Sequence, residues 1–207
     1  DADLGFGTLT SATGWSSLRS VSTEDFSVPF GAYCVPGSLT PTWPGCPNYP
    51  QPAYGRFDYI PDGTKLVQEV RLTSPDEQRL RWMVGGYFAK EDVSGRLYVP
   101  AFSPAYANVD LLLDEITEST FKERAAFANL TFGLTDQLDV GIGGRYSEYD
   151  LDSCVVRSAG VLSSRLTRCY RSPTTNVSLW MLNASYKLDD RRMVYARAAN
   201  SFRPGSG

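Results

Sequence analysis

Histidine is absent from the 207 residues of this sequence. Its absence excludes a Ser-His-Asp or Cys-His catalytic triad, a zinc site with histidine ligands and a histidine general base. P-loop, GxSxG and HExxH motifs are also missing. The chain is therefore predicted not to be an enzyme, and no cofactor or metal is expected.

Net charge and long apolar runs are scarce as well. A net charge of −3 is too small to indicate a nucleic-acid-binding surface. The sequence has no run of 18 apolar residues and its mean hydropathy is −0.25, which excludes a transmembrane helix. The residues that are plentiful, 18 glycines, 13 prolines and 13% aromatics, favour an all-β chain with rigid loops.

The four cysteines fall into two local pairs without CxxC spacing. Cys34 and Cys46 bracket one turn-forming stretch, and Cys154 and Cys169 bracket another. Local pairing is the natural connectivity, although four cysteines allow three pairings, and four free thiols are the alternative. Two disulfides predict an oxidising compartment.

Three segments share one layout, in which two runs of alternating apolar and polar residues flank a short turn that contains aspartate. Period-2 alternation over about 10 residues is typical of a transmembrane β-strand. A soluble β-sandwich shows the same alternation, but its strands are usually about 5–6 residues long. The segments are predicted to be long β-hairpins and cover residues 66–92, 124–150 and 176–202.

Within these runs, one face is apolar and the other carries glycine, serine, threonine, asparagine and arginine. Aromatic residues occur on the apolar face near both ends of the runs, as in the two girdles of a membrane barrel. Ordinary core aromatics of a sandwich are the alternative. The residues predicted to face lipid are Trp82, Val84, Phe88, Leu130, Phe132, Val140, Ile142, Trp180, Leu182 and Tyr186.

The connections between the runs differ in length. The three turns near Asp76, Asp136 and Asp190 are short, and the links 20–62, 93–120 and 151–175 are long. This asymmetry is typical of outer-membrane barrels, whose periplasmic turns are short and whose extracellular loops are long. The long link 93–120 contains four acidic residues without EF-hand spacing, so a solvated acidic loop is expected rather than a calcium site.

The opening run, Leu4–Trp15, brings the predicted strand count to seven. Seven strands are not the usual even number of a closed barrel, and a bare sheet edge is costly in lipid. We therefore expect the terminal strands, Leu4–Trp15 and Met193–Phe202, to pair outside residues 1–207 rather than with each other. The partner would be further sequence of the same protein, another copy or a different chain.

The sequence resembles the barrel of TonB-dependent receptors of the Gram-negative outer membrane. The resemblance lies in VQEVRLTSP (67–75), LRWMVGGYFAKED (80–92), ERAAFANLTFGLTDQLDVGIGGRYSEYD (123–150) and YKLDDRRMVYARAANSFRPG (186–205). It implies a 22-stranded antiparallel up-and-down barrel with an N-terminal plug, which takes up siderophores, cobalamin or glycans with energy from TonB. Residues 1–207 show no plug, TonB box or C-terminal barrel end, so they are expected to be one part of the barrel that meets TonB only through the missing plug.

Residues 26–55 contain no charged residue and hold seven of the 13 prolines. Pro-rich chain is stiff, and tyrosine and tryptophan offer flat contact surfaces. The segment is a candidate ligand- or protein-contacting loop, although its aromatics could equally pack on one another over the barrel mouth. The candidate contact residues are Phe30, Tyr33, Trp43, Tyr49 and Tyr54.

Two functional hypotheses follow, and neither is enzymatic; a third, a soluble, secreted β-sandwich enzyme, is disfavoured because the sequence lacks a catalytic constellation. The first is part of a TonB-dependent transporter for siderophore, cobalamin or glycan-type substrates, embedded in outer-membrane lipid and completed by additional β-strands. The alternative is a structural or interaction protein, a degenerate receptor fragment whose strand edges pair with a partner or with itself.

Overall fold

The computed structural model describes residues 1–25, 54–102, 108–158, 160 and 164–202, and these form a single antiparallel sheet of ten strands. Their order in the sheet is β1-β2-β4-β5-β6-β7-β9-β10, while β3 pairs with β4 and β8 with β7. The strands are β1 (Ala2–Asp3), β2 (Thr8–Arg19), β3 (Ser22–Asp25), β4 (Tyr54–Thr73), β5 (Leu80–Phe102), β6 (Asn108–Gly133), β7 (Leu138–Arg157), β8 (Leu166–Arg171), β9 (Thr175–Asp189) and β10 (Arg192–Ala199).

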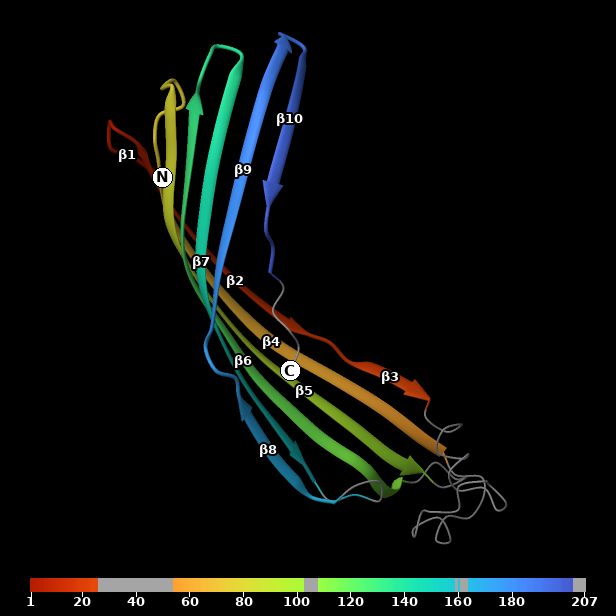
Figure 1. Cartoon of the computed structure of the whole chain (residues 1–207). Coiled ribbons are helices and arrows are strands. Elements are labelled where there is room, and N and C mark those ends of the chain that lie inside the picture. The colour runs from red at the N-terminus through yellow and green to blue at the C-terminus, as the bar shows by residue number, and fades with distance from the viewer. Residues whose placement is uncertain (26–53, 103–107, 159, 161–163, 203–207) are drawn as a thin grey trace.

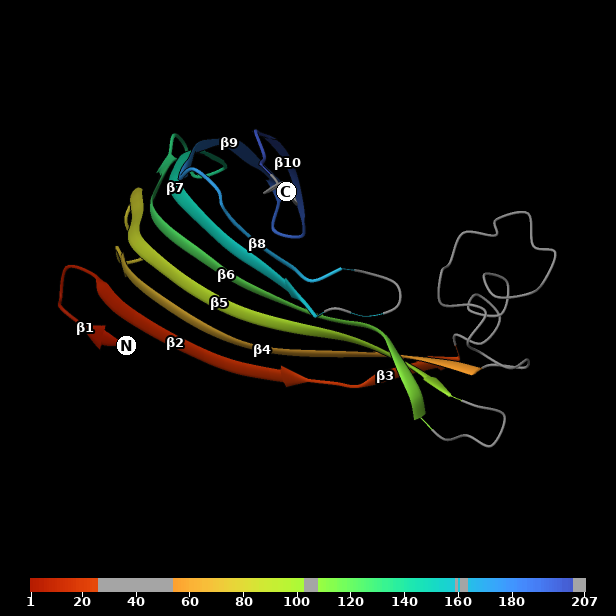
Figure 2. The same ribbon diagram turned by 90° about the horizontal axis from the view of Figure 1, so that it is seen from below.

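The sheet is a curved wall, one layer thick (Figure 1). Seen from below, it curls from β2 round to β10 like part of a barrel (Figure 2). The predicted all-β, up-and-down architecture is therefore confirmed, and the seven predicted strands correspond to β2, β4, β5, β6, β7, β9 and β10. None of the residues that the structure describes lies in a helix long and apolar enough to cross a membrane.

The predicted short turns are confirmed as tight connections at one end of the wall. Six residues lie between Thr73 at the end of β4 and Leu80 at the start of β5, and two residues lie between Asp189 at the end of β9 and Arg192 at the start of β10. In the β6–β7 turn, the Thr135 hydroxyl accepts hydrogen bonds from the backbone N–H groups of Gln137 and Leu138, at 3.2 and 3.0 Å. Such side-chain acceptors replace ladder partners where the chain reverses.

The prediction of long loops was wrong for much of their length. β5 continues to Phe102 and β6 begins at Asn108, so most of the link 93–120 is strand rather than an acidic loop. β7 likewise runs on to Arg157 and is followed by β8 within the link 151–175. The central strands are consequently 20 to 26 residues long, about twice the predicted length.

The extra length has a physical cause that hydrophobic alternation does not reveal. Strand pairing continues from the apolar part without a register shift up to Val99 on β5. The portions of the strands beyond the apolar rows, which we call the outer part of the sheet, carry charged and polar residues on both faces. These residues form ion pairs across the strands. Arg96 makes a two-pronged contact with Asp114 at 2.9 and 3.0 Å, and Arg157 donates to Glu115 at 2.7 Å.

The sheet is not closed within the described residues. β10 pairs with β9 alone, and the outer edge of β2 pairs only with β1, at Thr8 and Leu9. The expectation that the first and last predicted strands do not pair with each other is thus confirmed. Large apolar side chains on one side of the wall are solvent-accessible, with exposed fractions of 56% for Ile142 and 48% for Leu182. This exposure contradicts the alternative of a sandwich core.

Candidate functional site

The two faces of this wall are the candidate functional surfaces, and strand register decides which residues share a face. Directly paired residues of an antiparallel sheet point to the same side. One row across the wall joins Trp82, Leu130, Ile142 and Leu182. The predicted lipid-facing residues all lie on this face, which we call the outer face: Trp82, Val84, Phe88, Leu130, Phe132, Val140, Ile142, Trp180, Leu182 and Tyr186.

The apolar rows of the outer face end at a definite level. On β5 they run from Leu80 to Phe88, and the next row places Lys90 opposite Lys122. At about 3.3 Å per residue and a tilt of about 40°, the stretch from Leu80 to Phe88 rises by about 20 Å. That height is somewhat less than the apolar band of about 25 Å of an outer-membrane barrel. Lipid contact itself stays a prediction, which the exposure and height of these rows support.

The opposite face, which we call the inner face, carries arginines with acidic and aromatic partners. The Arg145 guanidinium contacts Glu123 at 2.5 Å, donates to the Ser147 hydroxyl at 3.0 Å and lies 5.0 Å from the centre of the Tyr87 ring. Arg81 on β5 forms a second ion pair with Asp139 on β7, at 2.9 Å. These contacts hold the two guanidinium groups in fixed positions over the inner face.

Glycines on the inner face make room for side chains of the neighbouring strands. A Cβ at Gly143 would collide with the Asn129 amide, and one at Gly141 would collide with Asn183. A Cβ at Gly85 would meet the Phe127 ring. The side chains of the adjacent strands therefore lie flat across these positions, which keeps the inner surface open.

A hollow of about 380 Å³ lies on the inner face between β4 and β10. Its polar lining includes Arg71, Arg145 and Arg197, and its apolar lining includes Phe127 and two methionines. Among the described residues, Arg197 has no carboxylate partner, whereas Arg71 lies 3.4 Å from Glu69. Guanidinium groups beside thioether and aromatic groups suit an anion that also has apolar parts.

Sequence reasoning did not single out these arginines, although a signal was present. Arg71, Arg145 and Arg197 occupy the polar positions of alternating runs. Only the register shows that three different strands bring them to one hollow. The acidic residues of 108–120 behave differently from the prediction, because Asp114 and Glu115 point to opposite faces and each pairs with its own arginine.

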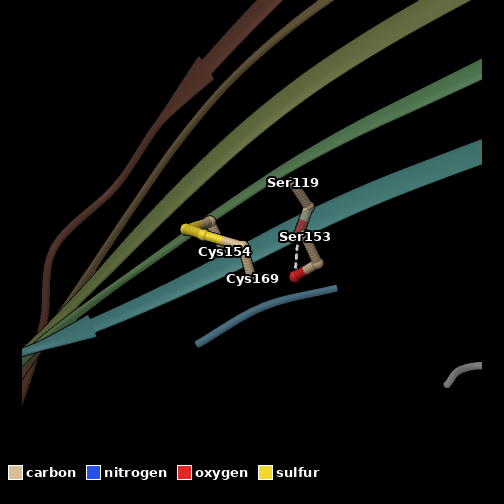
Figure 3. Close-up of a disulfide and its surroundings, with 4 residues drawn as sticks. All are labelled: Ser119, Ser153, Cys154 and Cys169. Carbon is tan, nitrogen blue, oxygen red and sulfur yellow. Dashed lines mark hydrogen bonds between the residues drawn. A yellow bond between two sulfur atoms is a disulfide. The ribbon is translucent and has the colours of Figure 1, made fainter. Parts of the chain in front are cut away.

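The predicted disulfide between Cys154 and Cys169 is confirmed. It joins β7 to β8, where the two cysteines are direct partners with Cα atoms 4.0 Å apart (Figure 3). Beside it, the hydroxyls of Ser119 and Ser153 share a hydrogen bond of 2.9 Å between β6 and β7.

The other predicted loop features are outside the described residues. These are the pair Cys34 and Cys46 and the contact candidates Phe30, Tyr33, Trp43 and Tyr49, while Tyr54 begins β4. Within the part of the chain that the structure describes, no three acidic, cysteine or histidine side chains gather as they would around a metal ion.

Charged groups just beyond the apolar rows have shifted pKa values. Hydrogen bonds from Lys90 and from the Thr120 hydroxyl lower the pKa of Asp92. The contact with Asp114 raises the pKa of Arg96. Both shifts favour the ionised form, so the ion pairs of the outer part persist at neutral pH.

Comparison with known proteins identifies a family and similar solved structures. A family described as TonB dependent receptor-like, β-barrel, matches residues 2–207. The crystal structure of the ferric yersiniabactin uptake receptor FyuA from Yersinia pestis is similar with a TM-score of 0.59 and 24% identity, over 69% of this chain. The chain spans 21% of the length of FyuA. No curated protein matches.

Proposed function

The chain belongs to the TonB-dependent receptor β-barrel family, and from this premise we propose that it forms part of the wall of an outer-membrane transporter in a Gram-negative bacterium. The observation that carries the proposal is the contrast between the two faces. The outer face is apolar over about 20 Å, close to the apolar band of about 25 Å of an outer-membrane barrel. The inner face carries arginines in ion pairs with carboxylates and a hollow lined in part by Arg71, Arg145 and Arg197.

In this role the chain is a scaffold rather than a catalyst, as in a family of transporters and receptors. Further β-strands at β2 and β10 complete the barrel, because unpaired N–H and C=O groups in lipid cost several kcal/mol each. TonB supplies energy through a plug domain, and the wall lines the path of the substrate. The inner-face hollow is the part of this chain that meets the plug or the substrate.

For the substrate, we propose a ferric siderophore within the wider class of siderophores, cobalamin and glycans. Arg197 provides a charge-assisted hydrogen bond for an anionic ligand beside Arg71 and Arg145, which already contact Glu69 and Glu123. Phe127, Met83 and Met181 provide apolar contact. The structurally similar FyuA is a ferric yersiniabactin uptake receptor, which agrees with this choice. A neutral glycan would make less use of the arginines.

A photo-crosslinking amino acid placed on either face of β9 tests the membrane assignment. Leu182 and Met181 are adjacent, so they lie at one depth on opposite faces. At position 182 the probe should crosslink to lipid acyl chains in outer membranes, and at position 181 it should not. Equal lipid labelling at both positions would contradict the proposal.

Uptake of radioactive iron tests the substrate. In iron-starved cells, Arg197→Gln should weaken ferric-siderophore uptake by about tenfold in apparent affinity, the effect of losing one charge-assisted hydrogen bond. Arg191→Gln, in the β9–β10 turn, is the matched control and should leave uptake unchanged. An unchanged Arg197→Gln variant would exclude this hollow from the substrate path.

The alternative function, pairing of strand edges with a partner or a second copy, draws its support from the exposed edges of β2 and β10. Crosslinking between cysteines placed at Ser16 and Ala198 in two differently tagged copies would detect self-pairing. Tagged copies that remain separate in outer membranes would leave the transporter wall as the function.

A further inference from the structure

The apolar rows of the outer face, which we call the belt, contain a second hollow of about 480 Å³. It lies at the end of the belt where the charged rows begin. Its floor is formed by Gly86 and Ala126, which are direct partners on β5 and β6. Phe88, Val70 and Tyr146 form its sides. A Cβ built at Gly86 would meet a single atom within 4 Å, a backbone oxygen 3.9 Å away, so the space above the floor is open.

This hollow has a lining suited to a ligand with an apolar body. It is shallow and open to its surroundings, and the surface that lines it is mainly apolar. The row of the outer face that joins Leu130, Ile142 and Leu182 is filled by bulky side chains. The small residues Gly86 and Ala126 leave a recess beside the larger side chains of Phe88, Val70 and Tyr146.

The upper end of the recess is charged. Arg124 and Glu148 line it, and the next row of the outer face brings Lys90 directly opposite Lys122. Like charges that face each other across two strands are destabilising. Lys90 is compensated by Asp92, 2.7 Å away, whereas Lys122 interacts with Asp92 only at longer range and forms no ion pair within 4.0 Å among the described residues.

The acidic groups on this part of the outer face are largely engaged elsewhere. Asp92 also accepts a hydrogen bond from Thr120, and Asp150, opposite Lys122, accepts one from Thr174 at 2.7 Å. Glu148 lies opposite Arg124, yet no salt bridge within 4.0 Å joins them. Among the described residues, Lys122 and Arg124 thus form no ion pair, unlike Arg96, Arg157 and Arg171 of the outer part of the sheet.

We propose that the recess binds one acyl chain of an outer-leaflet lipid, whose phosphate headgroup is held by Arg124 and Lys122. The recess lies where the apolar rows end and the charged rows begin, which is the level at which acyl chains meet headgroups. A phosphate there relieves the repulsion between Lys90 and Lys122 and gains charge-assisted hydrogen bonds from the guanidinium. The assignment to the outer leaflet rests on the proposed membrane orientation.

The test uses protein purified from outer membranes, washed in mild detergent and analysed by native mass spectrometry for retained phosphate-bearing lipid, with lipopolysaccharide and phospholipid distinguished by mass. The unsubstituted protein should retain a phosphate-bearing lipid. Ala126→Leu, which fills the recess, and the double variant Lys122→Gln with Arg124→Gln should each retain at least about tenfold less. Ala184→Leu, on the same face but outside the recess, is the control and should retain the lipid fully.

Three results would overturn the inference: equal retention by Ala126→Leu and Ala184→Leu, equal retention of a lipid that lacks phosphate, or displacement of the lipid by millimolar inorganic phosphate without any effect of Ala126→Leu. The last result would indicate a free-phosphate site. Crosslinking at position 182 separates this inference from the proposed function. If that probe reaches lipid and Ala126→Leu changes nothing, only the recess is wrong; if the probe fails, the membrane assignment fails as well.

Discussion

The belt and the outer part of the same strands differ in sequence but not in backbone structure. In the belt, apolar and polar residues alternate strictly, as from Leu138 to Tyr146 on β7. Farther along β7, from Asp150 to Arg157, both faces carry charged or polar residues, and yet the pairing with β6 continues in the same register. Alternation therefore reports a difference in polarity between the two sides of a strand, which the proposed membrane assignment attributes to lipid and water, and it does not report the length of the strand.

The inner face gives the complementary lesson, because it changes little between the two regions. Arg145 and Arg157 lie on the same face of β7, and each pairs with a glutamate of β6. Their side chains are similarly half-buried. Under the proposed membrane assignment, the inner face meets water or protein along its whole height, so its chemistry has no reason to change where the membrane ends.

The largest expected effect comes from placing a charge on the outer face of each region. Ile142→Arg should lower the free energy of unfolding in lipid vesicles by about 2–4 kcal/mol, because the side chain lies at the middle of the apolar belt. Val156→Arg, on the same strand and face but above the belt, should cost at most about 1 kcal/mol. Equal losses in urea-unfolding experiments would show that the belt does not contact lipid.

Removal of the disulfide should lower local stability only in the outer part of the sheet. It closes a loop with a sequence separation of 15, which the chain-entropy model values at about 3 kcal/mol. In the double variant Cys154→Ser with Cys169→Ser, amide hydrogen exchange should rise in residues 166–171. Exchange in 138–146 should stay the same, and faster exchange there would mean that the two regions unfold together.

The inner-face ion pairs should be equivalent in the two regions. Arg145→Ala and Arg157→Ala each leave a half-buried glutamate without its partner, at a cost of about 1–3 kcal/mol. Urea unfolding of the two single variants measures the difference. A much larger loss for one of them would mean that the inner face is not uniformly hydrated.

Acid should weaken the outer region slightly. The pKa of Asp92 is lowered in the folded protein, so its contribution is present at neutral pH and is lost as the pH falls below about 4 and through the folded-state pKa. Because the pair with Lys90 is well exposed, the contribution is about 0.2–0.5 kcal/mol after solvent screening. Asp92→Asn should therefore be less stable than the unsubstituted protein at pH 7 but equally stable near pH 2. A stability difference that persists near pH 2 would assign the effect to another contact.

Much of the fold was readable from local sequence pattern. Strict alternation in runs such as Leu80–Phe88 identified the strands that carry the belt, because lipid on one side demands apolar residues at every second position. The turns around Asp136 and Asp190 and the pair Cys154 and Cys169 were equally local signals. Each depended on residues a few positions apart, whose constraints do not need the rest of the chain.

The sequence by itself determined the all-β architecture, the apolar outer face and the seven main strands that do not close into a barrel. Only the tertiary structure decided that 93–102 and 108–120 are strands, because their stability comes from partners across the sheet, such as Arg96 with Asp114, rather than from a periodic pattern. Register likewise brought Arg71, Arg145 and Arg197 to one hollow, and Gly86 and Ala126 to the floor of another. These residues are far apart in sequence or inconspicuous within it, and pairing between strands is what gives them a common site.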